Sequence, residues 1–181
     1  PYQFDNGKVP CVVDRRGGDP VPEHDSTGQL IYLLQRYYRF TGDRAMLARH
    51  LPRVAAGIDY LDSLRQQRLT DEYRDGPPEK RACYGLVTES ISHEGYSAKP
   101  MHSYWDDFWA LRGYKDAVEV AKALGKEDEA RRMAASRDQF RKDLYASIRT
   151  ATQAHGIDFI PGAAELGDFD PTSTTIALAP G

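Results

Sequence analysis

The strongest constraint on the fold of this chain is a repeated alternation between apolar and charged helical segments. Apolar segments are predicted to begin near residues 26, 104 and 172, and a charged segment follows each of the first two. Each apolar segment and its charged successor make a helical hairpin, and the hairpin starts recur roughly every 70 to 80 residues. Common solenoid repeats are about 34 to 47 residues long with short loops, so this longer period favours a ring of inner and outer helices.

Turn and capping residues divide the chain into segments. We expect a loop over 1–25, a first hairpin over 26–67, a long connection over 68–102, a second hairpin over 103–148, a loop over 149–171 and the start of a further inner helix over 172–181. Ser26 and Gln29 have the spacing of a capping box, and Pro52 predicts a break in the charged half of the first hairpin. Gly42 ends the first helix and Asp43 can cap the next one, and Gly125 stands where a left-handed cap would end the third helix. Asp170 before Pro171 predicts the start of the last helix. A wide apolar stripe predicts that the first helix is mostly buried, and its members are Leu30, Ile31, Leu33, Leu34, Tyr37 and Tyr38.

The predicted fold class is all-α, with alternating inner and outer helices of a toroid. Five helices are too few to close such a ring, because six hairpins need upwards of about 250 residues. We therefore expect an incomplete toroid, with the rest of its own chain as a partner. The long connection over 68–102 is an expected active-site loop, because structureless loops of this length in compact domains are often functional.

Composition and motif searches exclude several function classes. The formal net charge of −3 and the pI near 6.0 argue against a nucleic-acid partner, and no apolar run approaches the roughly 20 residues that cross a bilayer. Phosphate-binding glycine motifs and histidine or cysteine spacings typical of zinc are absent from the sequence, so we expect no cofactor and no metal. Cys11 and Cys83 are read as two separate thiols, although a fold that brings them together would allow a disulfide.

Acidic and aromatic residues gather where the apolar helices are predicted to begin. In a ring the inner helices run in the same direction, so these starts would meet at one end of the cavity. Helix capping explains Asp25 and Asp170 equally well, but it explains Asp106 and Asp107 less well because Ser103 already offers a cap. Aromatic faces beside carboxylates suit a sugar ligand. The candidate binding residues are Glu23, His24, Asp25, His102, Trp105, Asp107, Trp109, Asp168 and Asp170.

Three motifs in this order resemble those of the six-hairpin glycosidases. They are the Glu-His-Asp-Ser-Thr-Gly-Gln run at 23–29, the Tyr-Trp-Asp-Asp-Phe-Trp run at 104–109 and the Asp-Pro-Thr-Ser-Thr run at 170–174. This superfamily of (α/α)6 toroid enzymes includes glucoamylases, trehalases and related bacterial glycoside hydrolases. The resemblance implies that the chain covers the middle hairpins of such a toroid. It also implies an oligosaccharide or polysaccharide substrate and, for a bacterial polysaccharide-degrading enzyme, a periplasmic or secreted location.

The resemblance further implies roles for individual residues. Asp106 inherits the role of general acid and Asp107 a substrate contact, although the family has Glu at the first of these positions. Glu94 is the second candidate for the acid and Glu89 the third. The expected reaction inverts the anomeric centre, with a base from a later hairpin, so these residues alone would be inactive. The rival interpretations are a non-catalytic helical-repeat module that binds a glycan or a protein, and a toroid with lyase or epimerase chemistry.

Overall fold

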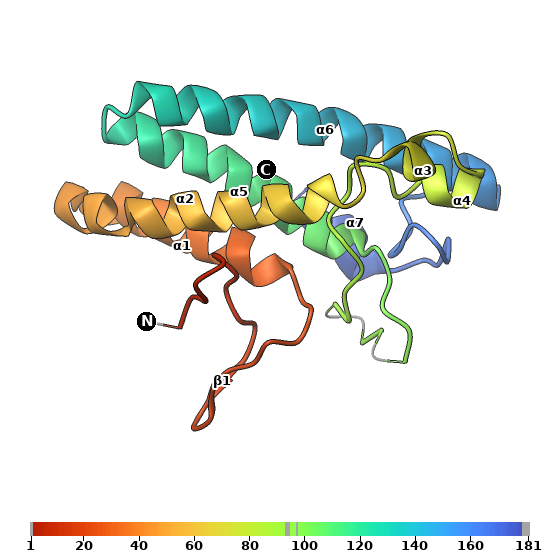
Figure 1. Ribbon diagram of the computed structural model, residues 1–181, viewed down its shortest axis with the longest axis horizontal. Coiled ribbons are helices and arrows are strands. Elements are labelled where there is room, and N and C mark those ends of the chain that lie inside the picture. The colour runs from red at the N-terminus through yellow and green to blue at the C-terminus, as the bar shows by residue number, and fades with distance from the viewer. Residues whose placement is uncertain (1, 93–94, 97, 179–181) are drawn as a thin grey trace.

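The computed structural model describes residues 2–92, 95–96 and 98–178, and these residues are mostly helical (Figure 1), which confirms the all-α class. Four long helices dominate: α1 (Asp25–Thr41), α2 (Arg44–Gln66), α5 (Tyr104–Ala123) and α6 (Glu127–His155). The short helices are α3 (Asp71–Arg74), α4 (Pro78–Arg81) and α7 (Pro171–Ile176). Strand β1 (Val13–Asp14) pairs antiparallel with β2 (Gly17–Gly18) in a small hairpin that projects from the helices.

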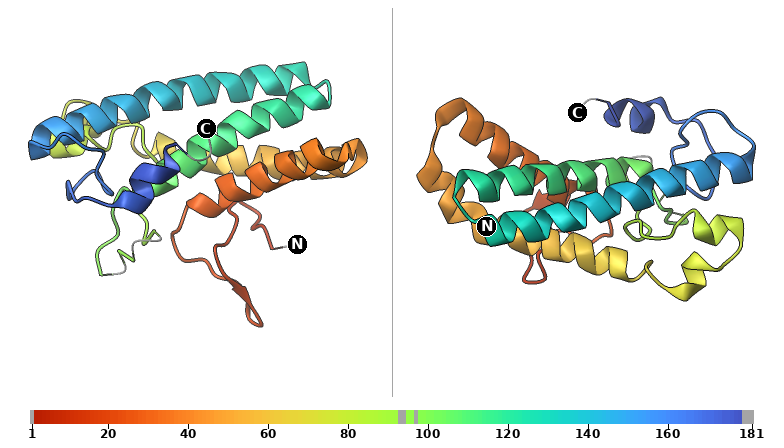
Figure 2. Two further views of the ribbon diagram at one scale, coloured as in Figure 1. Left: turned by 180° about the vertical axis from the view of Figure 1, so that it is seen from behind. Right: turned by 90° about the horizontal axis from the view of Figure 1, so that it is seen from above.

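The helices form two αα hairpins, α1 with α2 and α5 with α6, which lie side by side with the same orientation (Figures 1 and 2). Asp25 at the start of α1 contacts Trp105 at the start of α5. Farther along both helices, the Arg112 guanidinium lies 4.9 Å from the centre of the Tyr32 ring, so α1 and α5 run parallel. Arg132 pairs with Asp59 and Asp143 with Arg65, so α2 and α6 run parallel as well.

Glycines permit the close contact between α1 and α5. A Cβ atom added to Gly28 would lie 2.0 Å from the carbonyl oxygen of Trp109, and one added to Gly113 would lie 2.8 Å from the Cα atom of Gly28. Any larger residue at these two positions would therefore push the helices apart. The contact holds the N-terminal turns of both helices next to each other.

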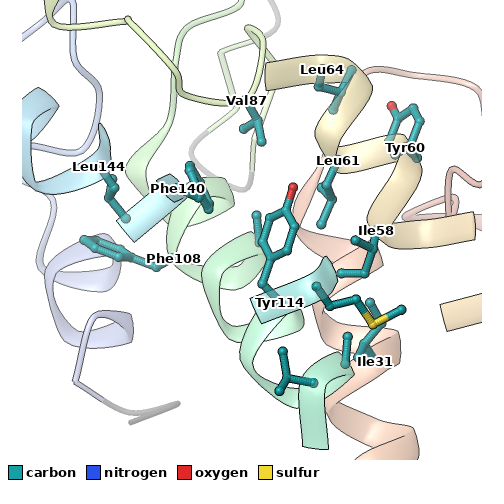
Figure 3. Close-up of a cluster of buried hydrophobic side chains, with 14 of the residues drawn as sticks. Ile31, Ile58, Tyr60, Leu61, Leu64, Val87, Phe108, Tyr114, Phe140 and Leu144 are labelled. Atoms are coloured by element: carbon teal, nitrogen blue, oxygen red, sulfur yellow. The ribbon is translucent and has the colours of Figure 1, made fainter. Parts of the chain in front are cut away.

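The core lies between the two hairpins (Figure 3). Ile31 from α1, Ile58 and Leu61 from α2, Tyr114 from α5 and Phe140 from α6 are all fully buried there. The phenol of Tyr114 donates a hydrogen bond of 2.6 Å to Asp62, which satisfies its polar atom at the edge of the apolar cluster. The helical spacing of Val54, Ile58 and Leu61, and of Met133, Phe140 and Leu144, predicts the buried faces of α2 and α6, and all six residues are buried.

Two local predictions are wrong. Pro52 does not break the first hairpin, because α2 continues through it from Arg44 to Gln66. Leu47, Leu51 and Val54 are buried on both sides of the proline, and this packing outweighs the hydrogen bond that proline cannot donate. The capping box does not form either, since His24 is the N-cap residue of α1.

The predicted burial of the first helix also fails on one face. Leu33 is 61% exposed and Tyr37 47%, because α1 contacts α2 and α5 on its other side. In contrast, Asp43 caps α2 and Asp170 caps α7 through bonds to backbone N–H groups, and Gly42 and Gly125 adopt left-handed conformations after helices.

Candidate functional site

The starts of α1 and α5 bring a carboxylate and two indole rings together. The indole N–H of Trp105 donates to Oδ2 of Asp25 at 2.8 Å, and Gln29 donates to the same oxygen at 2.7 Å. The rings of Trp105 and Trp109 meet edge to face, 6.1 Å between centres. Both tryptophans are partly exposed, whereas Asp25 is buried. Sequence reasoning placed all three residues at a common site, and the parallel packing of the helices brings them into contact.

Asp106 and Asp107 are both completely enclosed. Ser90 donates a 2.5 Å hydrogen bond to Oδ2 of Asp106 and accepts one from the backbone N–H of Ser92. Ser92 has a φ angle of 46°, an uncommon conformation for a residue other than glycine, and its hydroxyl bonds that of Ser103. Asp106 therefore anchors the turn over 90–92 against the start of α5, and it cannot touch a ligand unless this turn moves.

The Asp107 side chain points into the protein. Its Oδ1 atom accepts a hydrogen bond of 3.1 Å from the backbone N–H of Val87. Burial raises the pKa of Asp107 to about 8, partly offset by this hydrogen bond and by the charge of Arg65. Asp107 is therefore protonated at neutral pH, and its bond to Val87 holds the long connection against the start of α5.

His24 links α1 to α2 and to the long connection. Its Nδ1 atom lies 3.4 Å from the Tyr60 hydroxyl, and its Nε2 atom lies 3.2 Å from the hydroxyl of Thr88. Burial lowers the pKa of His24 to about 4, so the ring is neutral at pH 7. Burial and the nearby charge of Asp106 raise the pKa of Tyr60 to about 12. This cluster fixes the long connection to the helix starts.

His102 is the centre of a second polar cluster. The Arg68 Nε–H donates to His102 Nε2 at 2.8 Å, so the proton of the neutral ring sits on Nδ1 and is donated to Glu165 at 2.5 Å. The backbone N–H of His102 also donates to Glu165, at 3.1 Å. Arg68 pairs with Glu89, and the Cys83 thiol lies in the same group.

Glu89 is the accessible acid of this cluster. Its side chain is 39% exposed, whereas that of Glu165 is 25% exposed. Partial burial opposes ionisation of Glu89, but hydrogen bonding and the charge of Arg68 outweigh it and lower its pKa. Glu89 is thus a carboxylate at the surface of the site, held in place by Arg68.

The remaining predicted residues lie at the edges of this region. Asp168 accepts hydrogen bonds from the backbone N–H of Ala163 at 3.2 Å and from Tyr96 at 3.3 Å, and Asp170 caps α7. The Cys11 thiol forms a hydrogen bond with Glu23. Burial, and after it this hydrogen bond, raises the pKa of Cys11 to about 12. Cys11 and Cys83 are both free thiols. Glu94 lies outside the described residues.

Sequence reasoning missed Arg68, Cys83 and Glu165 as site residues. Arg68 follows the end of α2, and Glu165 lies in the loop before α7. Backbone bonds from Tyr104 to Gly162 and from Ala164 to His102 bring that loop alongside the start of α5. Since these segments are some 60 residues apart in the chain, no local spacing could reveal the contact.

Comparison with known proteins gives no match, either to a family model, to a curated protein or to a solved structure. None of the helices in the described ranges is both long and apolar enough to cross a membrane.

Proposed function

We propose that this chain forms part of a glycoside hydrolase of the six-hairpin, (α/α)6 toroid kind, and that the starts of α1 and α5 lie at its sugar-binding end. The observation that supports the proposal is the contact between Asp25 and Trp105, with Trp109 beside them. It brings an acidic residue of the first hairpin next to two aromatic rings of the second, at the starts of α1 and α5. Aromatic rings stack on the apolar faces of sugars, and carboxylates accept hydrogen bonds from sugar hydroxyls.

Hydrolysis with inversion needs an acid for the leaving oxygen and a carboxylate that activates water. In this proposal Asp106 is the acid, which requires the 90–92 turn to open because Asp106 is enclosed. Glu89 reaches solvent without such a movement, but its lowered pKa suits hydroxyl binding or a base better than an acid.

The burial of Asp106 and Asp107 favours one alternative, a non-catalytic helical module that binds a glycan. The two functions differ in turnover rather than in binding. Asp106→Asn should abolish the release of new reducing ends and spare glycan binding if Asp106 is the acid. Equal turnover by the wild type and Asp106→Asn would remove it from that role. Binding without turnover by any form that includes the later hairpins would favour the module.

The binding test uses the intrinsic fluorescence of the protein. Trp105 and Trp109 are the only two tryptophans of the sequence, so fluorescence reports directly on the proposed site. Titration with a panel of neutral gluco-oligosaccharides of α and β linkage should give a saturable change. Trp105→Ala should weaken binding by about tenfold, as expected for a lost stacking contact. Tyr145→Ala removes an exposed aromatic ring from α6 and should leave binding unchanged. If no member of the panel binds, or if both variants weaken binding equally, the proposed site is wrong.

A further inference from the structure

We propose that Cys83, His102 and Glu165 form a site for a divalent transition metal ion, with Zn²⁺ as the ion that suits these ligands best. One ligand atom from each residue lies within 4.8 Å of the other two. Cys83 and His102 are each 3% exposed, so the group is enclosed on the protein side, while Glu165 reaches solvent and offers an entry path. This site is independent of the proposed glycosidase function.

The fold holds the three residues together from three separate segments. Cys83 follows α4, His102 precedes α5, and Glu165 lies in the loop before α7. Backbone hydrogen bonds join the segments of His102 and Glu165, including the bond of 3.0 Å from Ala164 to the carbonyl of His102. Backbone pairing therefore holds two of the three ligands next to each other.

The ligand types are those that zinc takes in proteins. Zinc binds thiolate, imidazole and carboxylate at about 2.0 to 2.3 Å, which places tetrahedral ligand atoms about 3.4 Å apart. The Nδ1 atom of His102 and the Oε1 atom of Glu165 are now 2.5 Å apart, so they would separate by about 1 Å to admit the ion. Three protein ligands leave the fourth position for water, as in catalytic rather than structural zinc sites.

The proton balance of His102 is consistent with metal binding through Nδ1. Without the ion, Nδ1–H donates to Glu165 and Nε2 accepts from Arg68. With the ion on Nδ1, the ring proton moves to Nε2, which lies 4.0 Å from an oxygen of Glu89. Arg68 then releases Nε2 but keeps its ion pair with Glu89. A carboxylate that accepts the second N–H of a ligating histidine is the usual outer partner in such sites.

Binding would displace one proton per ion from the Cys83 thiol to solvent. The ring of His102 only moves its proton from one nitrogen to the other, and Glu165 binds as a carboxylate. A cysteine thiol ordinarily carries its proton at neutral pH and binds a metal ion as the thiolate. A thiolate and a carboxylate neutralise the charge of a divalent ion, which limits the cost of placing it in an enclosed site.

The test adds Co²⁺ to the reduced, metal-stripped protein. We expect one equivalent to bind, with a near-ultraviolet sulfur-to-cobalt charge-transfer band, visible bands typical of tetrahedral cobalt, and release of one proton per ion. Cys83→Ser should abolish the charge-transfer band, and Cys11→Ser is the matched control that should retain it. Glu89→Gln should weaken Zn²⁺ affinity by about 10- to 100-fold, as for other outer partners of ligating histidines.

Circular dichroism would reveal a variant that fails to fold, and in that case the wild type alone still tests the site. Zn²⁺ should raise the melting temperature of the wild type and of Cys11→Ser but not of Cys83→Ser. A wild type that binds no Co²⁺, or binds it without the charge-transfer band and without proton release, would overturn the site. So would a band that survives in folded Cys83→Ser.

Discussion

Replacing Gly28 by alanine should loosen the contact that forms the candidate site. The new Cβ atom would lie 2.0 Å from the carbonyl oxygen of Trp109, far inside the contact distance of about 3.5 Å. The obstacle is backbone, so α1 and α5 must separate by more than about 1 Å. Overpacking of this kind costs about 3 kcal/mol, and the higher helix propensity of alanine returns about 1 kcal/mol. The net loss in the free energy of unfolding is therefore about 2 kcal/mol.

Gly57→Ala provides the matched control, because Gly57 also lies inside a helix. Its added Cβ atom would first meet Cγ2 of Thr27, at 3.0 Å, and a side-chain atom can shift where backbone cannot. An overpacking cost of about 1 kcal/mol and a propensity gain of about 1 kcal/mol should nearly cancel. The two variants thus share the propensity gain and differ in the steric cost alone.

Urea unfolding followed by circular dichroism measures the difference. For a chain of this size, the loss predicted for Gly28→Ala lowers the melting temperature by about 4 to 8 °C. Because Trp109 lies at the contact, its fluorescence should also change in folded Gly28→Ala but not in folded Gly57→Ala. If Gly28→Ala is as stable as Gly57→Ala, the close parallel packing of α1 and α5 is refuted.

Three further variants test other parts of the fold by urea unfolding. Pro52→Ala should stabilise by about 2 kcal/mol, because α2 regains a backbone donor and loses only a small advantage in the unfolded chain; unchanged or lower stability would contradict a continuous helix there. Asp107 keeps its proton in the folded state up to about pH 8, whereas the unfolded chain loses it near pH 4, so its stabilising effect is complete below pH 4 and is lost as the pH rises to about 8. Asp107→Asn should remove this dependence of stability on pH, whose slope is at most about 1.4 kcal/mol per pH unit. If the wild type and Asp107→Asn show the same pH dependence of stability at pH 5, 6.5 and 8, the raised pKa is refuted. Arg65→Ala leaves the buried carboxylate of Asp143 without its 2.8 Å partner and should destabilise by about 3 to 5 kcal/mol, so a loss below about 1 kcal/mol would show that the pair is solvated.

Local signals predicted much of the fold. The capping aspartates at 43 and 170 lie beside the N–H groups that they bind. The glycines at 42 and 125 adopt left-handed conformations, which residues with a side chain rarely adopt. The spacing of apolar residues predicted the buried sides of α2 and α6, because every third or fourth residue of a helix lies on the same side. The approach of Trp105 to Asp25 followed from the expectation that the apolar helices run parallel.

Tertiary packing decided the remainder, because burial depends on what lies opposite a residue. The apolar stripe of α1 carries no sign of which side a second helix will cover, and so Leu33 is exposed while Ile31 is buried. Pro52 stays inside a helix because the core holds both of its flanks. The sequence predicts that Asp106 and Asp107 contact a ligand, yet the long connection folds over both of them. The group of Cys83, His102 and Glu165 exists because distant segments pair through their backbones. The sequence by itself determined most of the long helical segments and where they start, whereas the packing of distant segments kept α2 continuous through Pro52 and determined which polar side chains meet.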